Sequence, residues 1–212
     1  MRAALDAASR CSGPLVGIHS EVFTPALADL IRRGVATGRY KGINHGKAVF
    51  TFAMGDRAMH RFLNDNLALE SHPVNYVNDP AVIAQNDNVI SVNSTVEIDL
   101  TGACNSEHVN GHQFTAAGGQ LDFVRGAYAS PGGRSVIAFA STTRGGTISK
   151  IVPRLSGPVT TPRNEIHYVA TEYGIVDLKG LSSTDRAISL IGLVHPDYRE
   201  WLTEAAQRMH LV

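Results

Sequence analysis

The stretch Leu15-Val16-Gly17-Ile18-His19-Ser20-Glu21, followed by Thr24-Pro25, provides the first indication of the fold. Residues 15–18 are apolar or small and predict a short buried strand. Thr24 is a suitable N-cap and Pro25 suits the first helical position, where its missing N–H costs nothing, so a helix is predicted to begin there. Glu21 is therefore predicted to lie on a tight strand-to-helix connection, a common place for reactive side chains in α/β proteins.

The rest of the chain alternates between apolar β-branched runs and helical patterns, which is typical of an α/β protein. Gly34 is a suitable residue to end the first helix, and Asp56 is a suitable N-cap for the second. The predicted strands cover residues 48–53, 89–92, 96–100, 135–140 and 166–170. The predicted helices cover residues 25–33, 56–63, 184–193 and 198–208.

The composition excludes several classes of protein. The 212 residues are 43% hydrophobic, enough for a proper core, and 19 basic residues balance 19 acidic ones. Because the net charge is zero, nothing indicates binding to nucleic acid or to a membrane surface. Cys11 and Cys104 are the two cysteines and form no Cys-x-x-Cys pair, which argues against a disulfide scaffold or a cysteine-rich zinc site. The start lacks a signal peptide and no stretch approaches membrane-spanning length, so we expect a cytoplasmic protein.

Two features of the sequence could serve in nucleophilic catalysis, one as the nucleophile and one as the site that binds the oxyanion. A positioned and partly desolvated Glu21 carboxylate could attack an activated acyl group, although an exposed glutamate that completes a turn remains the plain alternative. Gly118 and Gly119 would let adjacent backbone N–H groups approach a ligand without a Cβ in the way and form an oxyanion-binding nest. A tight turn is the alternative for these glycines.

Other polar residues follow predicted strands or lie in glycine-rich loops. Glu172 follows the strand at 166–170, so it is predicted at the carboxyl end of a strand, where ligands bind in open α/β sheets; a residue that caps a turn is the alternative. Asn93 carries a neutral amide that can orient an oxygen without a salt bridge, or it is a turn residue. The stretch Gly145-Gly146-Thr147-Ile148-Ser149-Lys150 could cradle a phosphate, with Lys150 as a point charge, or form a β-turn before an edge strand.

Several familiar motifs are excluded. His108 and His112 have the spacing of helical metal ligands, but the asparagines and glycine around them indicate a loop, so no metal site is predicted. The loop at 42–48 has the wrong spacing for a P-loop. The sequence also lacks the Gly-x-Gly-x-x-Gly and Gly-x-Ser-x-Gly patterns of dinucleotide-binding proteins and α/β-hydrolases.

Several of the segments described above, together with others along the chain, occur in an order that resembles the C-terminal half of the acetyl-CoA hydrolase/transferase family. This family includes the 4-hydroxybutyrate CoA-transferases. The resemblance runs from Leu15 to about Trp201. It is carried by the following segments: Gly17-Ile18-His19-Ser20-Glu21, Pro73-Val74-Asn75-Tyr76-Val77-Asn78, Ala84-Gln85-Asn86-Asp87-Asn88, Ser91-Val92-Asn93-Ser94, residues 118–127, residues 146–153, Thr171-Glu172-Tyr173-Gly174 and His195-Pro196-Asp197-Tyr198.

The resemblance implies a CoA-transferase-type (NagB/RpiA-like) α/β fold, an open mixed or parallel sheet flanked by helices. Proteins of this family have two related halves with the active site between them, and this chain resembles the second. Residues 1–14 are then the tail of a connecting helix, and residues 15–212 are the C-terminal catalytic domain. We expect a homo-oligomer, or pairing with a missing N-terminal half, with no nucleic acid or membrane as partner.

The resemblance also implies the chemistry. Glu21 matches the nucleophile, which forms a glutamyl-CoA thioester as CoA passes between small carboxylic acids. Gly118 and Gly119 match the oxyanion loop, Asn93 matches a residue at the reacting centre, and Glu172 has a supporting role. Coenzyme A and acyl-CoA are substrates, and no permanently bound cofactor is expected. The expected CoA contacts are Gly118, Gly119, Gln120, Gly146, Ser149 and Lys150.

One departure from the family pattern concerns the glycine loop. The pattern is Gly-x-Gly-Gly, and Ala116 stands at its first position, which predicts strain if that position takes a positive φ. Two other functions stay open at this point. One is hydrolysis of acyl-CoA through the same intermediate, and the other is a non-catalytic CoA-binding or assembly half.

Overall fold

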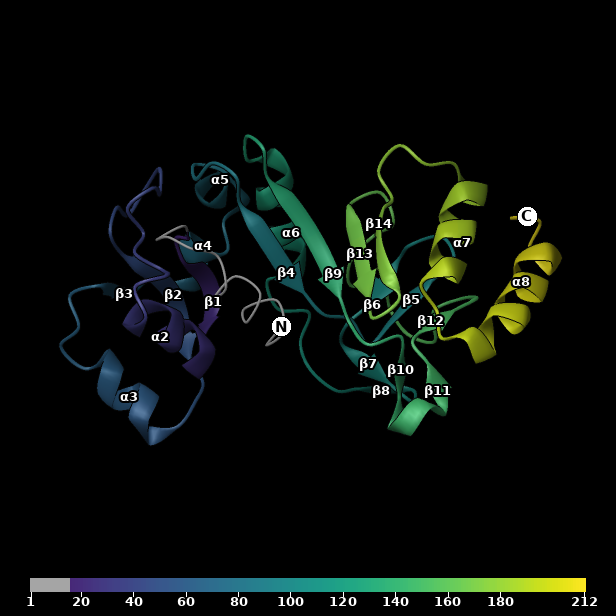
Figure 1. Ribbon diagram of the computed structural model, residues 1–212, viewed down its shortest axis with the longest axis horizontal. Helices are drawn as coiled ribbons and strands as arrows, with labels where there is room; N and C mark the ends of the chain where they lie inside the picture. Colours follow the sequence, from purple (N-terminus) through teal and green to yellow (C-terminus); the bar gives the residue numbers. More distant parts are fainter. Residues whose placement is uncertain (1–15) are drawn as a thin grey trace. The chain divides into compact units, whose positions relative to one another are not determined.

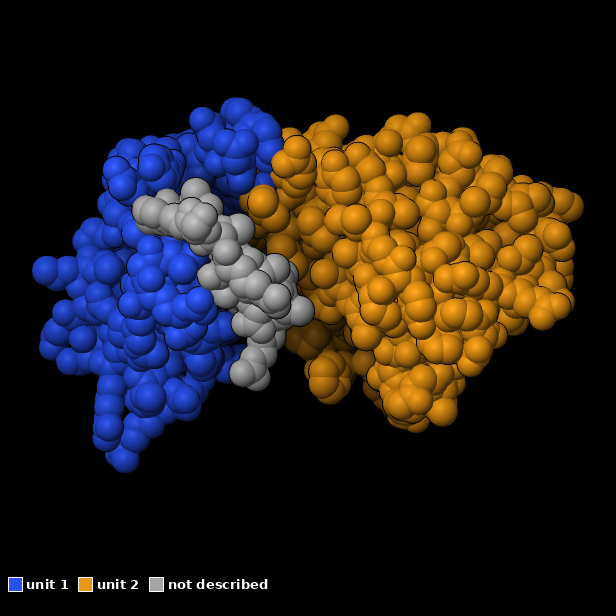
Figure 2. All heavy atoms as spheres, in the orientation of Figure 1, with its two compact units in different colours: residues 1–89, 129–133 blue, residues 90–128, 134–212 orange. Residues whose placement is uncertain are grey.

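The computed structural model describes residues 16–212, which form two compact units. Unit 1 comprises residues 16–89 and 129–133, and unit 2 comprises residues 90–128 and 134–212 (Figure 2). The predicted tail at 1–14 and the start of the predicted first strand, Leu15, lie outside the described residues. The prediction of one catalytic domain over 15–212 stays a prediction.

Unit 1 is built on a three-stranded parallel sheet in the order β1-β2-β3 (Figure 1). The strands are β1 (His19–Phe23), β2 (Ala48–Ala53) and β3 (Leu69–Ser71). The helices are α2 (Pro25–Arg32), α3 (Arg57–Leu63), α4 (Val74–Val77) and α5 (Pro80–Ile83). This arrangement confirms the predicted second strand and the first two predicted helices to within a residue.

The helix ends in unit 1 follow the local sequence. Thr24 is the N-cap of α2 with Pro25 after it, although the Thr24 hydroxyl makes no capping hydrogen bond. Gly34 follows the helix with φ +70°, a left-handed conformation that favours glycine. Asp56 caps α3 by accepting a hydrogen bond from the Met59 backbone N–H at 2.8 Å.

The first strand differs from the prediction. Val16 forms only an isolated bridge to Ala36, and β1 instead covers His19–Phe23. Glu21 therefore lies inside a strand and not on a strand-to-helix connection, so this prediction was wrong. The polar run continues as a strand because β2 pairs with its backbone, from His19 opposite Val49 to Phe23 opposite Ala53.

Unit 2 contains a four-stranded mixed sheet in the order β14-β13-β9-β4. Its central strand pairs are parallel, and β13 and β14 form an antiparallel hairpin. A second, three-stranded sheet has the order β12-β5-β6. The strands of these two sheets are β4 (Ile90–Asn93), β5 (Glu97–Asp99), β6 (Cys104–Asn105), β9 (Arg134–Ala138), β12 (Ile151–Val152), β13 (Tyr168–Thr171) and β14 (Gly174–Asp177).

Two small hairpins and three helices complete unit 2 (Figure 1). The hairpins pair β7 (His108–Val109) with β8 (His112–Gln113), and β10 (Thr142–Thr143) with β11 (Ile148–Ser149). The helices are α6 (Gln120–Ala129), α7 (Ser183–Gly192) and α8 (Arg199–Arg208), with short 3₁₀ turns at Arg144–Gly146 and Pro196–Tyr198. The last two helices confirm the prediction, whereas α6 was not predicted.

Each unit has its own hydrophobic cluster. In unit 1 the cluster includes Phe23 and Phe50, whose ring centroids are 5.0 Å apart. In unit 2 the cluster joins both sheets to α6, α7 and α8; its members include Ile98, Val124, Ile137, Val169, Leu190 and Leu202. The predicted α/β class is thus correct at the level of mixed strands and helices, while the finer NagB/RpiA-like assignment stays a prediction.

Candidate active site

Glu21 lies on a polar face of the unit 1 sheet. His19 pairs with Val49, and Val49 pairs with Glu70, so these three side chains point to the same side. Glu21 is two residues beyond His19 and shares this face. The half-buried Glu21 carboxylate accepts a hydrogen bond from Asn78 Nδ2 at 3.1 Å.

Asn78 is a further candidate site residue, which the sequence analysis did not single out. It follows α4, is 9% exposed, and its Oδ1 has no hydrogen-bond partner among the described residues. Because its amide donates to Glu21, it orients the carboxylate without neutralising it. The only sequence signal was its place at the end of the family-like segment 73–78.

Two further basic groups border this face. His19 Nε2 lies 2.8 Å from the Val77 carbonyl oxygen, which can only accept, so Nε2 carries the proton. Burial lowers the pKa of His19; the hydrogen bond to Val77 opposes the shift, and the nearby charges of Lys41 and His72 add to it. His19 is therefore neutral at pH 7.

Lys41 is a buried lysine in the loop that connects α2 to β2. Its Nζ donates to the carbonyl oxygens of Ile18 at 3.2 Å and Lys47 at 3.0 Å. Burial lowers its pKa to about 8, with Glu70 acting in the opposite direction. The ammonium thus ties the loop to the start of β1 at an electrostatic cost.

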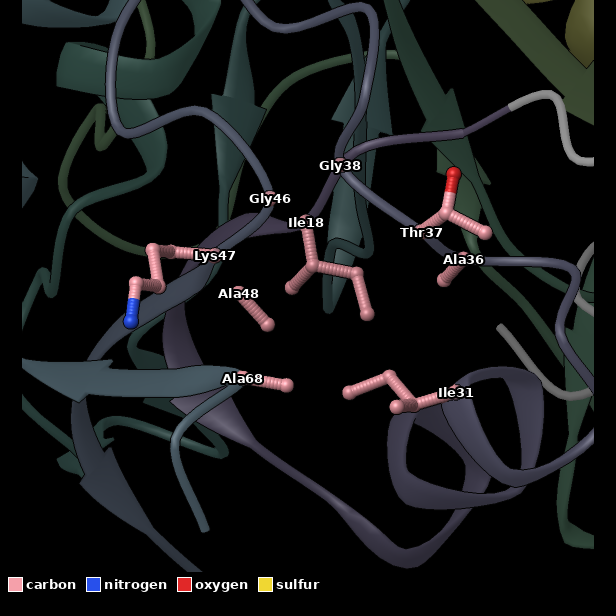
Figure 3. A pocket seen from close by; sticks show the side chains of 9 residues that line it. All are labelled: Ile18, Ile31, Ala36, Thr37, Gly38, Gly46, Lys47, Ala48 and Ala68. Carbon is pink, nitrogen blue, oxygen red and sulfur yellow. The ribbon is translucent and has the colours of Figure 1, made fainter.

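Unit 1 also contains a pocket of about 210 Å³ that Glu21 does not line. In Figure 3 the side chains of Ile18, Ile31, Ala48 and Ala68 converge on this space, while the Lys47 amine points away from it. The pocket is therefore apolar, and it is separate from the candidate catalytic glutamate.

In unit 2, Glu172 follows β13 directly, as predicted for a strand's carboxyl end. Its side-chain oxygens accept two hydrogen bonds from Ser141: the backbone N–H at 2.8 Å and the hydroxyl at 2.6 Å. Partial burial of the carboxylate raises the pKa of Glu172, but the Ser141 hydrogen bonds, with a smaller effect of His195, lower it below the usual range. Glu172 is therefore ionised at neutral pH.

Asn93 is the last residue of β4, opposite Ile137 of β9. Its Nδ2 is buried and has no hydrogen-bond partner among the described residues. A buried amide N–H without a partner carries a free-energy cost, and such groups are rare in folded proteins. This donor fits a residue that binds an oxygen of the substrate.

The predicted glycine loop leads into α6. Gly118 has φ +60°, and the Gly119 carbonyl accepts the first helical hydrogen bond, from Phe123 N at 3.0 Å. Ala116 does not take a positive φ, so the strain considered for that position is not present. Gln120 is buried and its Nε2 donates to Thr161 Oγ1 at 3.0 Å, so its side chain already has a structural partner.

The second predicted loop is the turn of the β10–β11 hairpin. Arg144, Gly145 and Gly146 have successive φ values of 49°, 67° and 95°, and Tyr198 donates to the Gly146 carbonyl at 2.8 Å. The Ser149 hydroxyl donates to the Ile151 carbonyl at 2.7 Å. The loop is thus a hairpin turn, and its contacts with CoA stay a prediction.

Lys150, which the sequence analysis predicts as a contact for CoA, lies near Glu172. Its Nζ is 5.0 Å from the Phe139 ring centroid. Burial lowers the pKa of Lys150, and the charge of Glu172 opposes this shift. The structure therefore brings Lys150 and Glu172 into one cluster, while Glu21 belongs to unit 1 and Asn93, Gly118, Gly119 and Glu172 belong to unit 2.

Neither a metal site nor a membrane helix is found in the described part of the chain. Residues 16–212 contain no group of three or more His, Cys, Asp or Glu side chains able to hold a metal ion. His108 and His112 lie on opposite strands of the β7–β8 hairpin, so they do not have helical spacing. No helix between residues 16 and 212 has the length and hydropathy needed to span a bilayer.

Comparison with known proteins shows the family to which this chain belongs. A sequence model of the acetyl-CoA hydrolase/transferase C-terminal domain matches residues 55–206, most of the chain. The chain is therefore a member of the acetyl-CoA hydrolase/transferase family, as its sequence predicted.

Particular relatives are CoA transferases. The chain is 46% identical over 199 residues to the succinyl-CoA:cyclohexane-1-carboxylate CoA transferase of Geobacter metallireducens, covering 93% of this chain and 46% of the relative. It is 44% identical over 189 residues to the 4-hydroxybutyrate coenzyme A transferase of Clostridium kluyveri, covering 88% of this chain and 44% of the relative.

A solved structure agrees in fold. The crystal structure of RipA from Yersinia pestis superposes with a TM-score of 0.94 at 59% identity, covering all of this chain and 48% of that one. The chain thus spans about half the length of the relatives it matches.

Proposed function

We propose that this chain is the nucleophile-bearing half of a CoA-transferase that moves CoA between small carboxylic acids, of the acetate, butyrate and 4-hydroxybutyrate class. The observation that carries the proposal is its 40–46% identity to transferases of this kind over about nine tenths of the chain. The butyryl-CoA:acetate CoA-transferase of Anaerostipes caccae, 40% identical over 201 residues, supports the same class of substrates.

In the proposed reaction Glu21 acts twice at its carboxylate. An oxygen of Glu21 attacks the thioester carbon, the C–S bond breaks, and CoA leaves as a thiolate, which produces an acyl–glutamyl anhydride. The thiolate then attacks the glutamyl carbon, the donor acid leaves as a carboxylate, and a glutamyl-CoA thioester remains. A second carboxylic acid reverses these steps and leaves as its CoA thioester.

The described contacts support a role for each residue. Asn78 holds the Glu21 carboxylate at 3.1 Å. Backbone N–H groups at Gly118 and Gly119 would stabilise the tetrahedral intermediates, a role that is typically worth a factor of about 10²–10³ in turnover. The buried Asn93 amide offers a donor to the substrate, and the ionised Glu172 has a supporting role.

Hydrolysis is the second candidate, because the acetyl-CoA hydrolase of Saccharomyces cerevisiae is 31% identical over 201 residues. Water would then intercept the anhydride or the glutamyl-CoA thioester. Release of CoA without any added carboxylic acid would indicate hydrolysis, whereas a requirement for an acceptor acid would indicate transfer.

A trapping experiment tests the nucleophile. The chain is incubated with acetyl-CoA or butyryl-CoA, treated with borohydride and digested, and its peptides are analysed by mass spectrometry. Reduction of a glutamyl-CoA thioester converts Glu21 to its alcohol. Glu21→Gln should give no product and no exchange but should still bind CoA, while Glu70→Gln, on the same sheet face, is the matched control and should still be trapped at Glu21.

Two results would contradict the proposal. Near-normal exchange by Glu21→Gln would exclude Glu21 as the nucleophile, as would modification at another residue. If CoA binds but no residue is modified, the chain is a binding half that needs its N-terminal partner, which fits its match to about half of its relatives' length.

A further inference from the structure

Ser141, which belongs to none of the motifs found in the sequence, makes two hydrogen bonds to Glu172. It is fully buried, and both of its donors bind the same side chain: the backbone N–H donates to one oxygen of Glu172 and the hydroxyl donates to the other. Hydrogen bonds to an ionised carboxylate are about twice as strong as those between neutral groups. Two of them, one on each oxygen, fix the rotation of the carboxylate as well as its position.

The serine itself is held on both sides. Before it, the Phe139 backbone N–H donates to the Ala170 carbonyl at 3.1 Å, which extends the pairing of β9 with β13 up to the turn that carries Glu172. After it, the Ser141 carbonyl accepts from the Lys150 backbone N–H at 2.8 Å. The donors therefore belong to a part of unit 2 that is fixed by main-chain hydrogen bonds.

We propose that Ser141 is a positioning residue of the transfer reaction, which holds the Glu172 carboxylate in one orientation through its backbone N–H and its hydroxyl. This inference rests on the proposed function, since it assumes that Glu172 acts in exchange. Ser141 acts only through Glu172, so its hydroxyl is needed to orient the carboxylate and not to touch the substrate.

Electrostatics supports this role. Glu172 is exposed overall, and an exposed glutamate in a two-residue turn would ordinarily sample several rotamers. Two basic side chains, Lys150 and His195, interact electrostatically with Glu172, and the guanidinium carbon of Arg199 lies 5.8 Å from the centroid of the neighbouring Tyr173 ring. Without the Ser141 hydroxyl, one carboxylate oxygen would lose its donor, and only the hydrogen bond from the Ser141 backbone N–H would oppose rotation towards these side chains.

The test compares Ser141→Ala with Ser141→Thr, which keeps the hydroxyl, and with Ser135→Ala as the matched control. Ser135 is a buried serine of the neighbouring strand β9, and its hydroxyl has no hydrogen-bond partner among the described residues. The first readout is the ¹³C NMR titration of glutamate carboxyl groups, with the Glu172 resonance identified by its absence in Glu172→Gln. The second is the rate of CoA exchange, separated into kcat and KM.

In the unchanged chain the pKa of Glu172 should lie below the ordinary glutamate range. Ser141→Ala should raise the pKa of Glu172 and lower kcat by roughly ten- to a hundredfold, with KM little changed, because the cost is one hydrogen bond to a charged group. Ser141→Thr should restore most of both quantities, and Ser135→Ala should change neither. If Ser141→Ala fails to fold, Ser141→Cys, which keeps a weak donor of similar size, should show the same changes to a smaller extent.

The two readouts separate this inference from the proposed function. An unchanged Glu172 titration in Ser141→Ala would overturn the positioning role, whatever the chain's activity. A raised pKa with undiminished exchange would equally overturn it, because the orientation would then be irrelevant to the reaction. If the chain shows no exchange and no trapping at Glu21, the proposed function fails, while the titration still decides whether Ser141 holds Glu172.

Discussion

The two candidate glutamates are held by different kinds of donor. Glu21 accepts from a side-chain amide, Asn78 Nδ2, whereas Glu172 accepts from the backbone and hydroxyl of Ser141. The donor to Glu21 is a side chain that follows a short helix, whereas one of the two donors to Glu172 belongs to the main chain. Both oxygens of Glu172 are thus held by one residue, whereas the contact described for Glu21 joins one carboxylate oxygen to a side chain 57 residues away.

At the residue scale, Asn78→Ala tests whether the hydrogen bond from Asn78 to Glu21 matters for exchange. Loss of the amide removes a hydrogen bond to a charged group, so we expect roughly a tenfold or greater fall in exchange and a smaller trapped fraction at Glu21. Asn75→Ala is the matched control, because Asn75 is an exposed asparagine on α4, the helix that Asn78 follows. Equal exchange rates for the Asn78 and Asn75 variants would show that the amide has no role in the reaction.

Lys41 gives a prediction on stability and pH. Its pKa of about 8 in the folded chain is below the ordinary 10.5, so the unfolded chain binds more protons between these values. The free energy of unfolding should therefore gain a contribution from Lys41 as pH rises through this window, by up to about 1.4 kcal/mol per pH unit. Urea unfolding of the wild type and Lys41→Met at several pH values measures it.

The comparison of wild type with Lys41→Met needs a control variant, and a second group, Cys104, also makes stability depend on pH. Burial raises the pKa of Cys104 to about 12 from 9.0, which lowers stability at high pH, but this effect is common to both proteins and cancels in their difference. Lys179→Met, at a half-buried lysine of unit 2, should keep the full pH dependence. A constant difference between wild type and Lys41→Met across the window would contradict the shifted pKa.

At the scale of elements, the apolar pocket of unit 1 exists because small residues line it where strands and helix meet. Ala48 begins β2 and Ala68 precedes β3, and the methyl groups of both face the pocket (Figure 3). Ile31 of α2 is the bulky side chain opposite them. A space of about 210 Å³ can accept additional methyl groups without displacing these neighbours.

Ala68→Val should therefore stabilise unit 1. The two added carbons move into apolar surroundings, which should raise the free energy of unfolding by roughly 1 kcal/mol, measured by urea or thermal unfolding. Ala117→Val, at an exposed loop position of unit 2, is the matched control and should change stability little. Destabilisation by Ala68→Val relative to this control would mean that the space is already filled.

At the scale of the whole molecule, the chain belongs to the acetyl-CoA hydrolase/transferase family but matches about half the length of its relatives. Its candidate residues are divided between two units, with Glu21 in unit 1 and Glu172 in unit 2. Whether such a half exchanges CoA alone is what the Glu21 trapping experiment decides. The predicted self-association, or pairing with an N-terminal half, remains a prediction at this scale.

The sequence by itself determined the local features and the family. Helix starts at Thr24-Pro25 and at Asp56 depend on residues within one turn, and β2 is a short apolar run, so local propensity was sufficient for these elements. The order of the family-like segments from Gly17 to Tyr198 was sufficient to identify the family, because it can be read without knowing how the chain folds.

The tertiary structure decided which side chains hold the two candidate glutamates. Asn78 and Glu21 are 57 residues apart, and Ser141 and Glu172 are 31 apart, so no local pattern could pair them. The same applies to β1, whose polar segment from His19 is a strand only because β2 pairs with it. Hydrogen bonds between distant segments form only once the chain has folded, and local propensity does not encode them.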